Sequence, residues 1–174
     1  RLYDNANPSY RLLRKWEQYR EWSVYVPALA GRYGAEDVFK WSKTDIDAVP
    51  PSKAHPSDSG YDLTAIKLIK SNGLVNFYDT GIKVFPDYGW YFLVFPRSSI
   101  SKTGYMLANS VGVIDRTYTG SIVIALIKVD ADRPGVELPI KIAQLVPMPI
   151  IHFSLVEVQD ESQLGTTRGN GGFG

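Results

Sequence analysis

The possible folds of this chain are limited most by a succession of short apolar runs rich in β-branched and aromatic residues. Turn sequences such as Ser71-Asn72-Gly73 and Arg133-Pro134-Gly135 lie between these runs, and nothing there has the length or the period of a crossover helix. Many short strands joined by turns are typical of an antiparallel sandwich or a jelly roll. The sequence therefore predicts a mainly β fold, with strands at Val75–Tyr78, Ile82–Phe85, Trp90–Phe95, Ile122–Lys128, Ile140–Val146 and Phe153–Val158.

The first part of the chain has a different pattern. From Ser9 to Trp22 the apolar residues fall near helical spacing, and Asn7-Pro8 ahead of them fits a helix cap followed by proline in the first turn. We expect the aromatic side chains of this segment to form a packing or interface surface. The chain is thus predicted to contain an N-terminal helical extension (residues 1–36), a β-barrel domain (37–166) and a glycine-rich C-terminal arm (167–174).

Composition excludes several classes of function. A chain of 174 residues suits one main domain, and a formal net charge of +1 gives no reason to expect nucleic-acid or membrane binding. The sequence has no cysteine and only two histidines, which rules out a Cys/His zinc site and disfavours a histidine-based triad. The apolar runs are too short to span a membrane and the N-terminus does not resemble a signal peptide. We therefore expect an intracellular protein, cytoplasmic or nuclear rather than secreted.

Asp115 is the first candidate for chemistry. It follows the apolar run Val111–Ile114, so its carboxylate is expected where a buried strand turns over. Burial and a nearby phosphate would both raise the pKa of this carboxyl group, which suits a general base for water. The same residue also fits a turn aspartate that bonds its own backbone, and for an isolated motif this second interpretation is the more frequent one.

Two further positions suit the binding of phosphate and of a cation. Arg97, Ser98 and Ser99 follow an apolar run, and one guanidinium with two hydroxyls can hold phosphate oxygens, although these residues also fit a polar strand end. Asp62 lies where a strand is expected to begin. A carboxylate that faces a triphosphate requires a cation between them, and Mg²⁺ is the usual one because it prefers oxygen ligands. The alternative for Asp62 is a capping or turn aspartate.

The remaining candidates are weaker on their own. Gln144 is a polar residue inside an apolar run, so its side chain must find a partner in the protein or in a ligand. Tyr118 suits stacking on a sugar or simple packing. The tail from Arg168 to Gly174 formally matches a dinucleotide-binding fingerprint, but no strand precedes it and no helix can follow it. It fits instead an arm that closes over a phosphate and a base, or a disordered terminus.

Five segments are informative because of the order in which they follow one another along the chain. They are SGYDL (59–63), PRSS (96–99), NSVGVIDRTYTG (109–120), KIAQLV (141–146) and RGNGGFG (168–174). Together they resemble the five ordered motifs of the trimeric dUTPase (dUTP pyrophosphatase) family, and five collinear motifs make a chance match negligible.

The resemblance covers residues 37–174 and implies a jelly-roll-like β-barrel that assembles as a homotrimer with sites at subunit interfaces. It also implies hydrolysis of dUTP to dUMP and pyrophosphate with Mg²⁺ as cofactor. That reaction limits uracil incorporation into DNA and supplies dUMP for dTMP synthesis.

The resemblance implies a role for each candidate residue. Asp115 would activate the water that attacks the α-phosphorus, with Gln144 near that water, and Asp62 would reach Mg²⁺ through its water shell. The segment 109–120 would form a nucleotide-binding hairpin. The residues that would bind the nucleotide are Arg97, Ser98 and Ser99 at the phosphates, Asn109, Gly112, Val113 and Val123 around uracil, Tyr118 on the deoxyribose, and Arg168, Phe173 and Gly174 in an arm from a neighbouring subunit.

Two features depart from the family pattern. The Ser-Thr-Gly that usually follows the last motif is absent after Gly174, so a weaker clamp on the γ-phosphate is expected. No motif of the family explains the first 36 residues.

Two alternatives remain. The dCTP deaminases resemble dUTPases in fold and in several motifs, but that family places a catalytic glutamate where this chain has Ala125, which disfavours deamination. The second alternative is a non-catalytic nucleotide-binding module that signals through the extra helix. The presence of Asp62, Asp115, Tyr118 and Phe173 argues against a degenerate site.

Overall fold

The structure is a computed structural model, and it describes residues 39–160, 162, 165 and 172. The helix expected within residues 1–36 lies outside the described residues, as do Arg168, Phe173 and Gly174 of the expected arm. In the described part of the chain no helix is long and apolar enough to cross a membrane.

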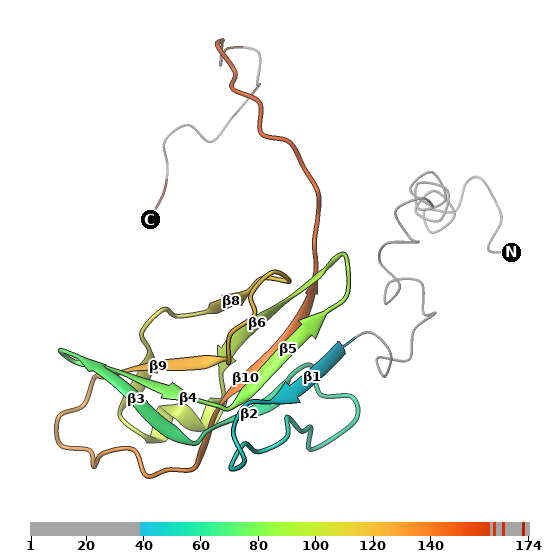
Figure 1. The fold of residues 1–174 in the computed structure, drawn as a ribbon. Helices are drawn as coiled ribbons and strands as arrows, with labels where there is room; N and C mark the ends of the chain where they lie inside the picture. The colour runs from blue at the N-terminus through green and yellow to red at the C-terminus, as the bar shows by residue number, and fades with distance from the viewer. Residues whose placement is uncertain (1–38, 161, 163–164, 166–171, 173–174) are drawn as a thin grey trace, which may run out of the picture.

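The described residues form a mainly β body, as the sequence predicts, in which every strand pairing is antiparallel (Figure 1). A single 3-10 helix, η2 (Ser98–Lys102), interrupts the succession of strands in this body. The strands are β1 (Phe39–Lys43), β2 (Tyr61–Ala65), β3 (Lys67–Asn72), β4 (Val75–Asp79), β5 (Ile82–Pro86), β6 (Trp90–Pro96), β7 (Tyr105–Leu107), β8 (Gly112–Ile114), β9 (Val123–Lys128) and β10 (Ile140–Pro149).

Two four-stranded sheets enclose one apolar core. Their strand orders are β2-β10-β6-β8 and β3-β4-β9-β7, while β1 and β5 form a separate pair. In β6 the side chains of Trp90, Phe92 and Val94 are buried and alternate with more exposed ones, the two-residue period of a strand with one face on a core. From the other sheet Ile124 and Leu126 enter the same core. Burial of each large apolar side chain stabilises the fold by about 1.5–3 kcal/mol.

Most of the strands expected from the sequence are confirmed. β4, β5 and β6 lie where the apolar runs predict them, β9 begins one residue later than expected, and β10 continues to Pro149. β8 lies within the apolar run Val111–Ile114, where a strand was expected before Asp115. The short strands β1, β3 and β7 were not predicted, because three to six residues carry too little periodicity to be separated from turns.

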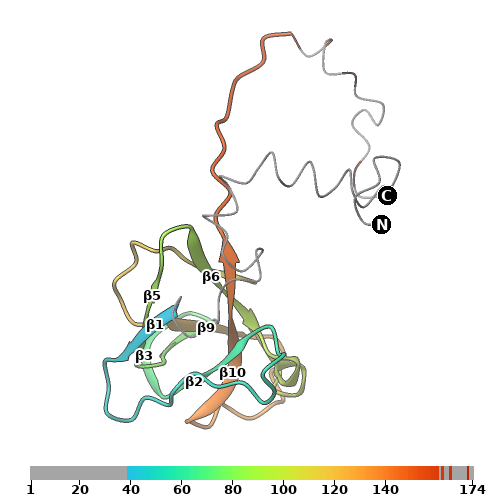
Figure 2. The same cartoon turned by 90° about the vertical axis from the view of Figure 1, so that its right-hand side faces the viewer.

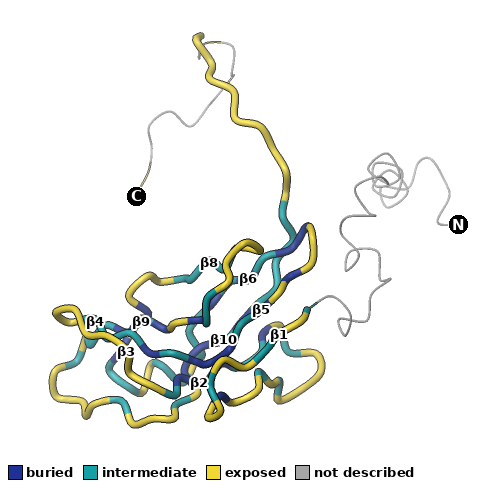
Figure 3. The backbone as a smooth tube through the Cα atoms, viewed as in Figure 1, coloured by how far each residue is buried: buried dark blue, intermediate teal, exposed yellow. Residues whose placement is uncertain are grey.

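The prediction of a strand at Phe153–Val158 is wrong. Residues 151–158 form no strand, and Figures 1 and 2 show this segment leading away from the body after β10. A strand needs a neighbour for its backbone groups, and none of the described strands pairs with this segment. The apolar side chains of the segment are therefore exposed, with Phe153 at 74% and Leu155 at 89% (Figure 3).

The expected hairpin at 109–120 is also corrected by the topology. β8 pairs with β6 in one sheet, whereas β9 lies between β4 and β7 in the other. β8 and β9 therefore belong to different sheets and do not pair with each other. The chain after β8 is instead a loop that crosses from one sheet to the other. We use the name crossing loop for residues 109–121, which include the short strand β8.

Candidate active site

Three segments that are far apart in the sequence line one polar cavity. β2 and β6 both pair with β10, and Gln144 of β10 lies opposite Asp62 on one side and Phe95 on the other. The three motif segments around these strands are therefore brought together at one place. The cavity has a volume of about 540 Å³ and is lined by Ala54, Ser57, Asp58, Ser59, Gly60, Asp62, Arg97, Ser98 and Gln144.

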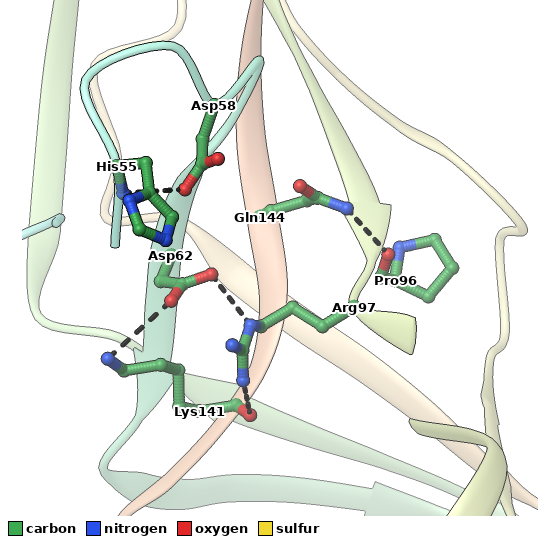
Figure 4. Close-up of polar contacts among 7 residues, drawn as sticks. All are labelled: His55, Asp58, Asp62, Pro96, Arg97, Lys141 and Gln144. Atoms are coloured by element: carbon green, nitrogen blue, oxygen red, sulfur yellow. Dashed lines mark hydrogen bonds and ion pairs between the residues drawn. The ribbon is translucent and has the colours of Figure 1, made fainter. Parts of the chain in front are cut away.

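Asp62 is held by two basic side chains in this cavity. Its Oδ1 atom lies 2.6 Å from Nε of Arg97, and its Oδ2 atom lies 3.5 Å from Nζ of Lys141 (Figure 4). Arg97 also donates from Nη1 to the carbonyl oxygen of Lys141, at 3.2 Å. The Asp62 side chain is only 16% exposed, so its charge is compensated locally rather than by water. Neither the capping nor the turn role considered for Asp62 accounts for this network.

The side chain of Gln144 forms a hydrogen bond within the protein, as expected for a polar residue in an apolar run. Its Nε2 atom donates to the carbonyl oxygen of Pro96, at 3.1 Å (Figure 4). On the other side, a Cβ atom added at Gly60 would lie 2.7 Å from Oε1 of Gln144 and 3.2 Å from its Cβ. A contact of 2.7 Å is shorter than real Cβ atoms make, so a side chain at this position would require the Gln144 amide to shift. Gly60 therefore leaves room for Gln144 to point its amide oxygen along the cavity.

The segment 97–99 lies where β6 ends and the 3-10 helix η2 begins. The backbone N–H of Arg97 donates to the carbonyl of Ile142 at 2.9 Å, which keeps this residue attached to β10. Ser98 and Ser99 then begin η2, and the first N–H groups of a helix have no partner within it. Ser98 lines the cavity, so a hydroxyl and backbone donors accompany the Arg97 guanidinium there.

The start of the crossing loop forms a second compact feature. A Cβ atom at Gly112 would lie 3.3 Å from Nδ2 of Asn109 and 3.2 Å from Cβ of Val94, so the Asn109 amide folds closely over Gly112. Ser110 between them has a φ of 60°, the left-handed conformation that a tight reversal requires. Val113 of β8 is 59% exposed, and Val123, the first residue of β9, is 36% exposed. Asn109 and Gly112 are thus brought together.

Asp115 lies in the exposed part of the crossing loop. Its carbonyl accepts a hydrogen bond from the N–H of Tyr118 at 3.0 Å, which closes a turn. Among the described residues its carboxylate has no hydrogen-bond or ion-pair partner. Asp115 is exposed, so the burial expected for its carboxylate is not found among the described residues.

Tyr118 is fixed more firmly than its exposure of 43% indicates. Its hydroxyl donates to the carbonyl oxygen of Ser121, at 2.8 Å. A Cβ atom at Gly120 would overlap the Tyr118 hydroxyl oxygen, so the hydroxyl end of the ring is folded back against Gly120. The loop thus holds the end of the side chain, while much of its surface remains exposed.

The cavity and Asp115 do not meet within the described part of one chain. Asp115 follows Ile114, which pairs with Phe92, whereas Arg97 lies beyond the far end of β6. At about 3.3 Å per residue, the distance along β6 from Phe92 to Arg97 is roughly 16 Å. No residue of the crossing loop is among those that line the cavity. The motif residues therefore form two separate groups on one copy of the chain.

Sequence reasoning missed two residues of this arrangement. Lys141 lies inside a motif segment, but only the strand pairing shows that its ammonium faces Asp62. Asp58 enters the cavity on the polar turn before Gly60, where its carboxylate accepts a hydrogen bond from the N–H of His55 at 2.9 Å (Figure 4). The serines around Asp58 are the sequence signal that marks this turn.

The donor set of the cavity bears on the metal that the sequence analysis expects. Among the described residues, no group of three or more His, Asp or Glu side chains is placed to hold a metal ion. The cavity does contain the carboxylates of Asp58 and Asp62. Mg²⁺ often binds through one or two carboxylates, several waters and the phosphates of a substrate. The residues present fit a Mg²⁺ that arrives with a polyphosphate.

Comparison with known proteins relates both the sequence and the fold to one family. The sequence profile of the dUTPase family matches residues 47–174. Over 148 residues the chain is 34% identical to the deoxyuridine 5'-triphosphate nucleotidohydrolase of Corynebacterium jeikeium, with 82% of this chain and 95% of that protein covered.

Solved structures show the same fold. The chain is similar to a dUTPase of Staphylococcus bacteriophage 80alpha solved with dUpNHpp, with a TM-score of 0.62, 22% identity, and 79% of this chain and 97% of that one covered. It is also similar to a dUTPase from phage phi11 of S. aureus described with a structural Mg(II) ion, with a TM-score of 0.59, 20% identity, and coverage of 71% and 98%.

Proposed function

This chain belongs to the dUTPase family, and we propose that it hydrolyses dUTP to dUMP and pyrophosphate at a site shared between copies of the chain. The observation that carries the proposal is the gathering of Asp62, Arg97, Ser98 and Gln144 around one polar cavity. These residues come from three motif segments that are separated in sequence. A triphosphate needs donors, positive charge and a cation in one place, and this cavity offers the first two itself.

The phosphate chain is assigned to this cavity. The guanidinium of Arg97, the hydroxyls of Ser98 and Ser99 and the backbone donors at the start of η2 bind phosphate oxygens. The pairing of Arg97 with Asp62 at 2.6 Å holds the guanidinium in one orientation, so less side-chain entropy is lost when the substrate binds.

We assign Mg²⁺ to the same cavity as the phosphates. When bound, it neutralises phosphate charge and helps to orient the α-phosphorus for attack. Asp62 holds it through the water shell, which is compatible with the ion pairs that Asp62 already forms with Arg97 and Lys141. The phi11 dUTPase described with a structural Mg(II) ion supports a metal in this family.

The chemical step needs a base and no covalent nucleophile. Asp115 takes a proton from a water molecule, whose oxygen attacks the α-phosphorus while the bond from that phosphorus to the bridging oxygen breaks. Pyrophosphate leaves with the electron pair of that bond. Gln144, held by Pro96, orients the water from the cavity side.

The nucleoside is assigned to the crossing loop. Asn109, Gly112, Val113 and Val123 surround the uracil, and the exposed surface of Tyr118 packs on the deoxyribose, where it leaves no room for a 2′-hydroxyl. The close contact between Asn109 and Gly112 supports a rigid base pocket, because only a tight polar pocket rejects bases of similar size.

A homotrimer with shared sites joins the two groups of residues. The roughly 16 Å of strand between the positions of Asp115 and Arg97 is too long for both to act on one phosphorus within a single copy. The exposed apolar side chains of residues 151–158, among them Leu155 and Val156, also favour contact with another copy. We assign Arg168, Phe173 and Gly174 to an arm that covers the nucleotide from a neighbouring copy.

The proposal is extended to the organisation and role of the protein. The β-barrel domain spans 37–166, between an extension at 1–36 and an arm at 167–174. Hydrolysis of dUTP inside the cell would limit uracil incorporation into DNA and supply dUMP.

The deciding experiment measures pyrophosphate release from dUTP, dCTP, dTTP and UTP in the presence of Mg²⁺. We expect turnover of dUTP alone. Ammonia release from dCTP would assign the chain to deamination instead, and tight dUTP binding without any product would assign it to a non-catalytic binding module.

A further inference from the structure

Tyr118 is connected to the end of β4 through a line of hydrogen bonds. The carbonyl of Ser121 accepts the Tyr118 hydroxyl, and the Ser121 hydroxyl donates to Oδ1 of Asp79 at the end of β4. The same Oδ1 accepts the backbone N–H of Gly81, at 2.9 Å. We call Asp79, Ser121 and Tyr118 the tyrosine brace. Its first two members lie 42 positions apart in the sequence, so only the folded sheet brings them together.

The anchor of the brace is rigid. Thr80, next to Asp79, is fully buried and donates from both its backbone N–H and its hydroxyl to the carbonyl of Ile122, at 3.1 and 2.8 Å. The N–H of Ile122 in turn donates to the carbonyl of Ile82 at 2.8 Å. The end of the crossing loop is thus joined to the turn between β4 and β5 by several hydrogen bonds, and Ser121 has little freedom to move.

The brace determines where the tyrosine ring lies. Tyr118 is on an exposed loop, where a side chain would normally exchange between rotamers. Here Gly120 lies against the hydroxyl end of the ring, and the carbonyl oxygen of Ser121 accepts a hydrogen bond from the Tyr118 hydroxyl. A ring that cannot move aside rejects an extra hydroxyl group on the sugar, whereas a mobile ring yields to it.

We propose that Asp79 and Ser121 are positioning residues that set the selectivity of this enzyme for deoxyribose by holding the Tyr118 ring in place. This rests on the proposed function, in which Tyr118 packs on the sugar of dUTP. Neither residue touches the phosphates or the water. Their loss should therefore change discrimination between sugars more than the rate of the chemical step.

The test compares kcat/KM for dUTP and for UTP in Asp79→Ala and Ser121→Ala. Ser121→Ala removes the hydrogen bond from Ser121 to Asp79, and Asp79→Ala removes this bond together with the one from the Gly81 N–H. In each variant we expect the dUTP-to-UTP ratio to fall about five- to tenfold with kcat for dUTP changed less than about twofold. Asp79→Asn should keep the ratio of the wild type, because its amide oxygen still accepts both hydrogen bonds. The double variant Asp79→Ala, Ser121→Ala should lose no more than either single one, because both act through one connection.

Ser71→Ala is the matched control. The Ser71 hydroxyl donates to Asn76 at 2.7 Å at the far end of the β3–β4 pair, so its loss removes a similar hydrogen bond away from the loop. Ser121→Ala leaves the Asp79–Gly81 bond intact and keeps the test valid if Asp79→Ala folds poorly. An unchanged ratio in Ser121→Ala, or a crystal structure of Asp79→Ala with the ring still on Gly120, would overturn the brace. Absence of dUTP turnover in the wild type would instead contradict the proposed function, and the crystal structure would still decide on the brace.

Discussion

The Arg97 guanidinium and the Asp62 carboxylate form an ion pair whose Nε–Oδ1 distance is 2.6 Å, between the end of β6 and the second residue of β2. One residue is assigned to the phosphates and the other to the cation that accompanies them. Their contact fixes the relative position of positive charge and metal before the substrate binds. Orientation established in advance reduces the cost of binding a flexible triphosphate.

Asp62→Asn tests this arrangement. The amide keeps the shape of the side chain but loses the charge that holds Arg97 and Lys141 and that attracts Mg²⁺. We expect kcat/KM for dUTP to fall roughly ten- to hundredfold, the loss of one hydrogen-bonded charge, and the Mg²⁺ concentration for half-maximal activity to rise. A titration of pyrophosphate release against Mg²⁺ measures both. A lower rate with an unchanged Mg²⁺ requirement would show that Asp62 only orients Arg97.

Gly60→Ala tests the space beside Gln144. The added methyl group would meet the Gln144 amide oxygen at 2.7 Å, so the amide must leave its place against Pro96. Misplacement of a positioning group by about 1 Å can cost on the order of a hundredfold in rate, and we expect a loss of kcat of that order.

Gly135→Ala is the control for this substitution. No atom lies within 4 Å of a Cβ added there, so the same chemical change should leave kcat unaltered. Thermal denaturation of both variants separates a local effect at Gln144 from general unfolding. Full activity in Gly60→Ala would mean that Gln144 has no part in the reaction.

Asp115→Asn tests the general base. The amide cannot accept a proton from water, and removal of a general base typically lowers a rate by about 10²–10⁴-fold. Because the side chain is exposed and has no partner among the described residues, the substitution should not reduce stability. We expect pyrophosphate release to be lost while calorimetry still detects binding of dUTP. Turnover close to the wild-type rate would exclude Asp115 as the base.

Much of the cavity could be predicted from the sequence because its residues lie in short segments whose types match their chemistry. Arg97, Ser98, Asp62 and Gln144 were identified in this way, and the structure brings them together, whereas Ser99 does not line the cavity. The contribution of Lys141 depends on the register between β2 and β10, which no local pattern encodes.

The errors of prediction have a common physical origin in pairing between distant segments. The crossing loop was expected to be a hairpin, but β8 pairs with β6 and lies in a different sheet from β9. The segment Phe153–Val158 has the composition of a strand but no strand neighbour among the described residues. The contact between Asp79 and Ser121 likewise exists only because β4 and β9 are adjacent.

A mixed assembly distinguishes a shared site from a site within one chain. Arg97→Ala and Asp115→Asn each remove one of the two groups of residues, so each variant alone should be inactive. In mixed trimers with sites shared between copies, some sites combine an intact Arg97 from one copy with an intact Asp115 from another. Every trimer that contains both variants has one such site among its three, so trimers selected through both tags recover about a third of the wild-type sites.

Co-expression of the two variants with different affinity tags, followed by double purification and an assay of pyrophosphate release, measures this recovery. The wild type purified in the same way sets the full value, and each variant paired with itself sets the background. If both groups acted within one chain, no mixed site would be complete and activity would stay at background. Recovery therefore reports directly on whether the cavity of one copy and the crossing loop of another act on the same nucleotide.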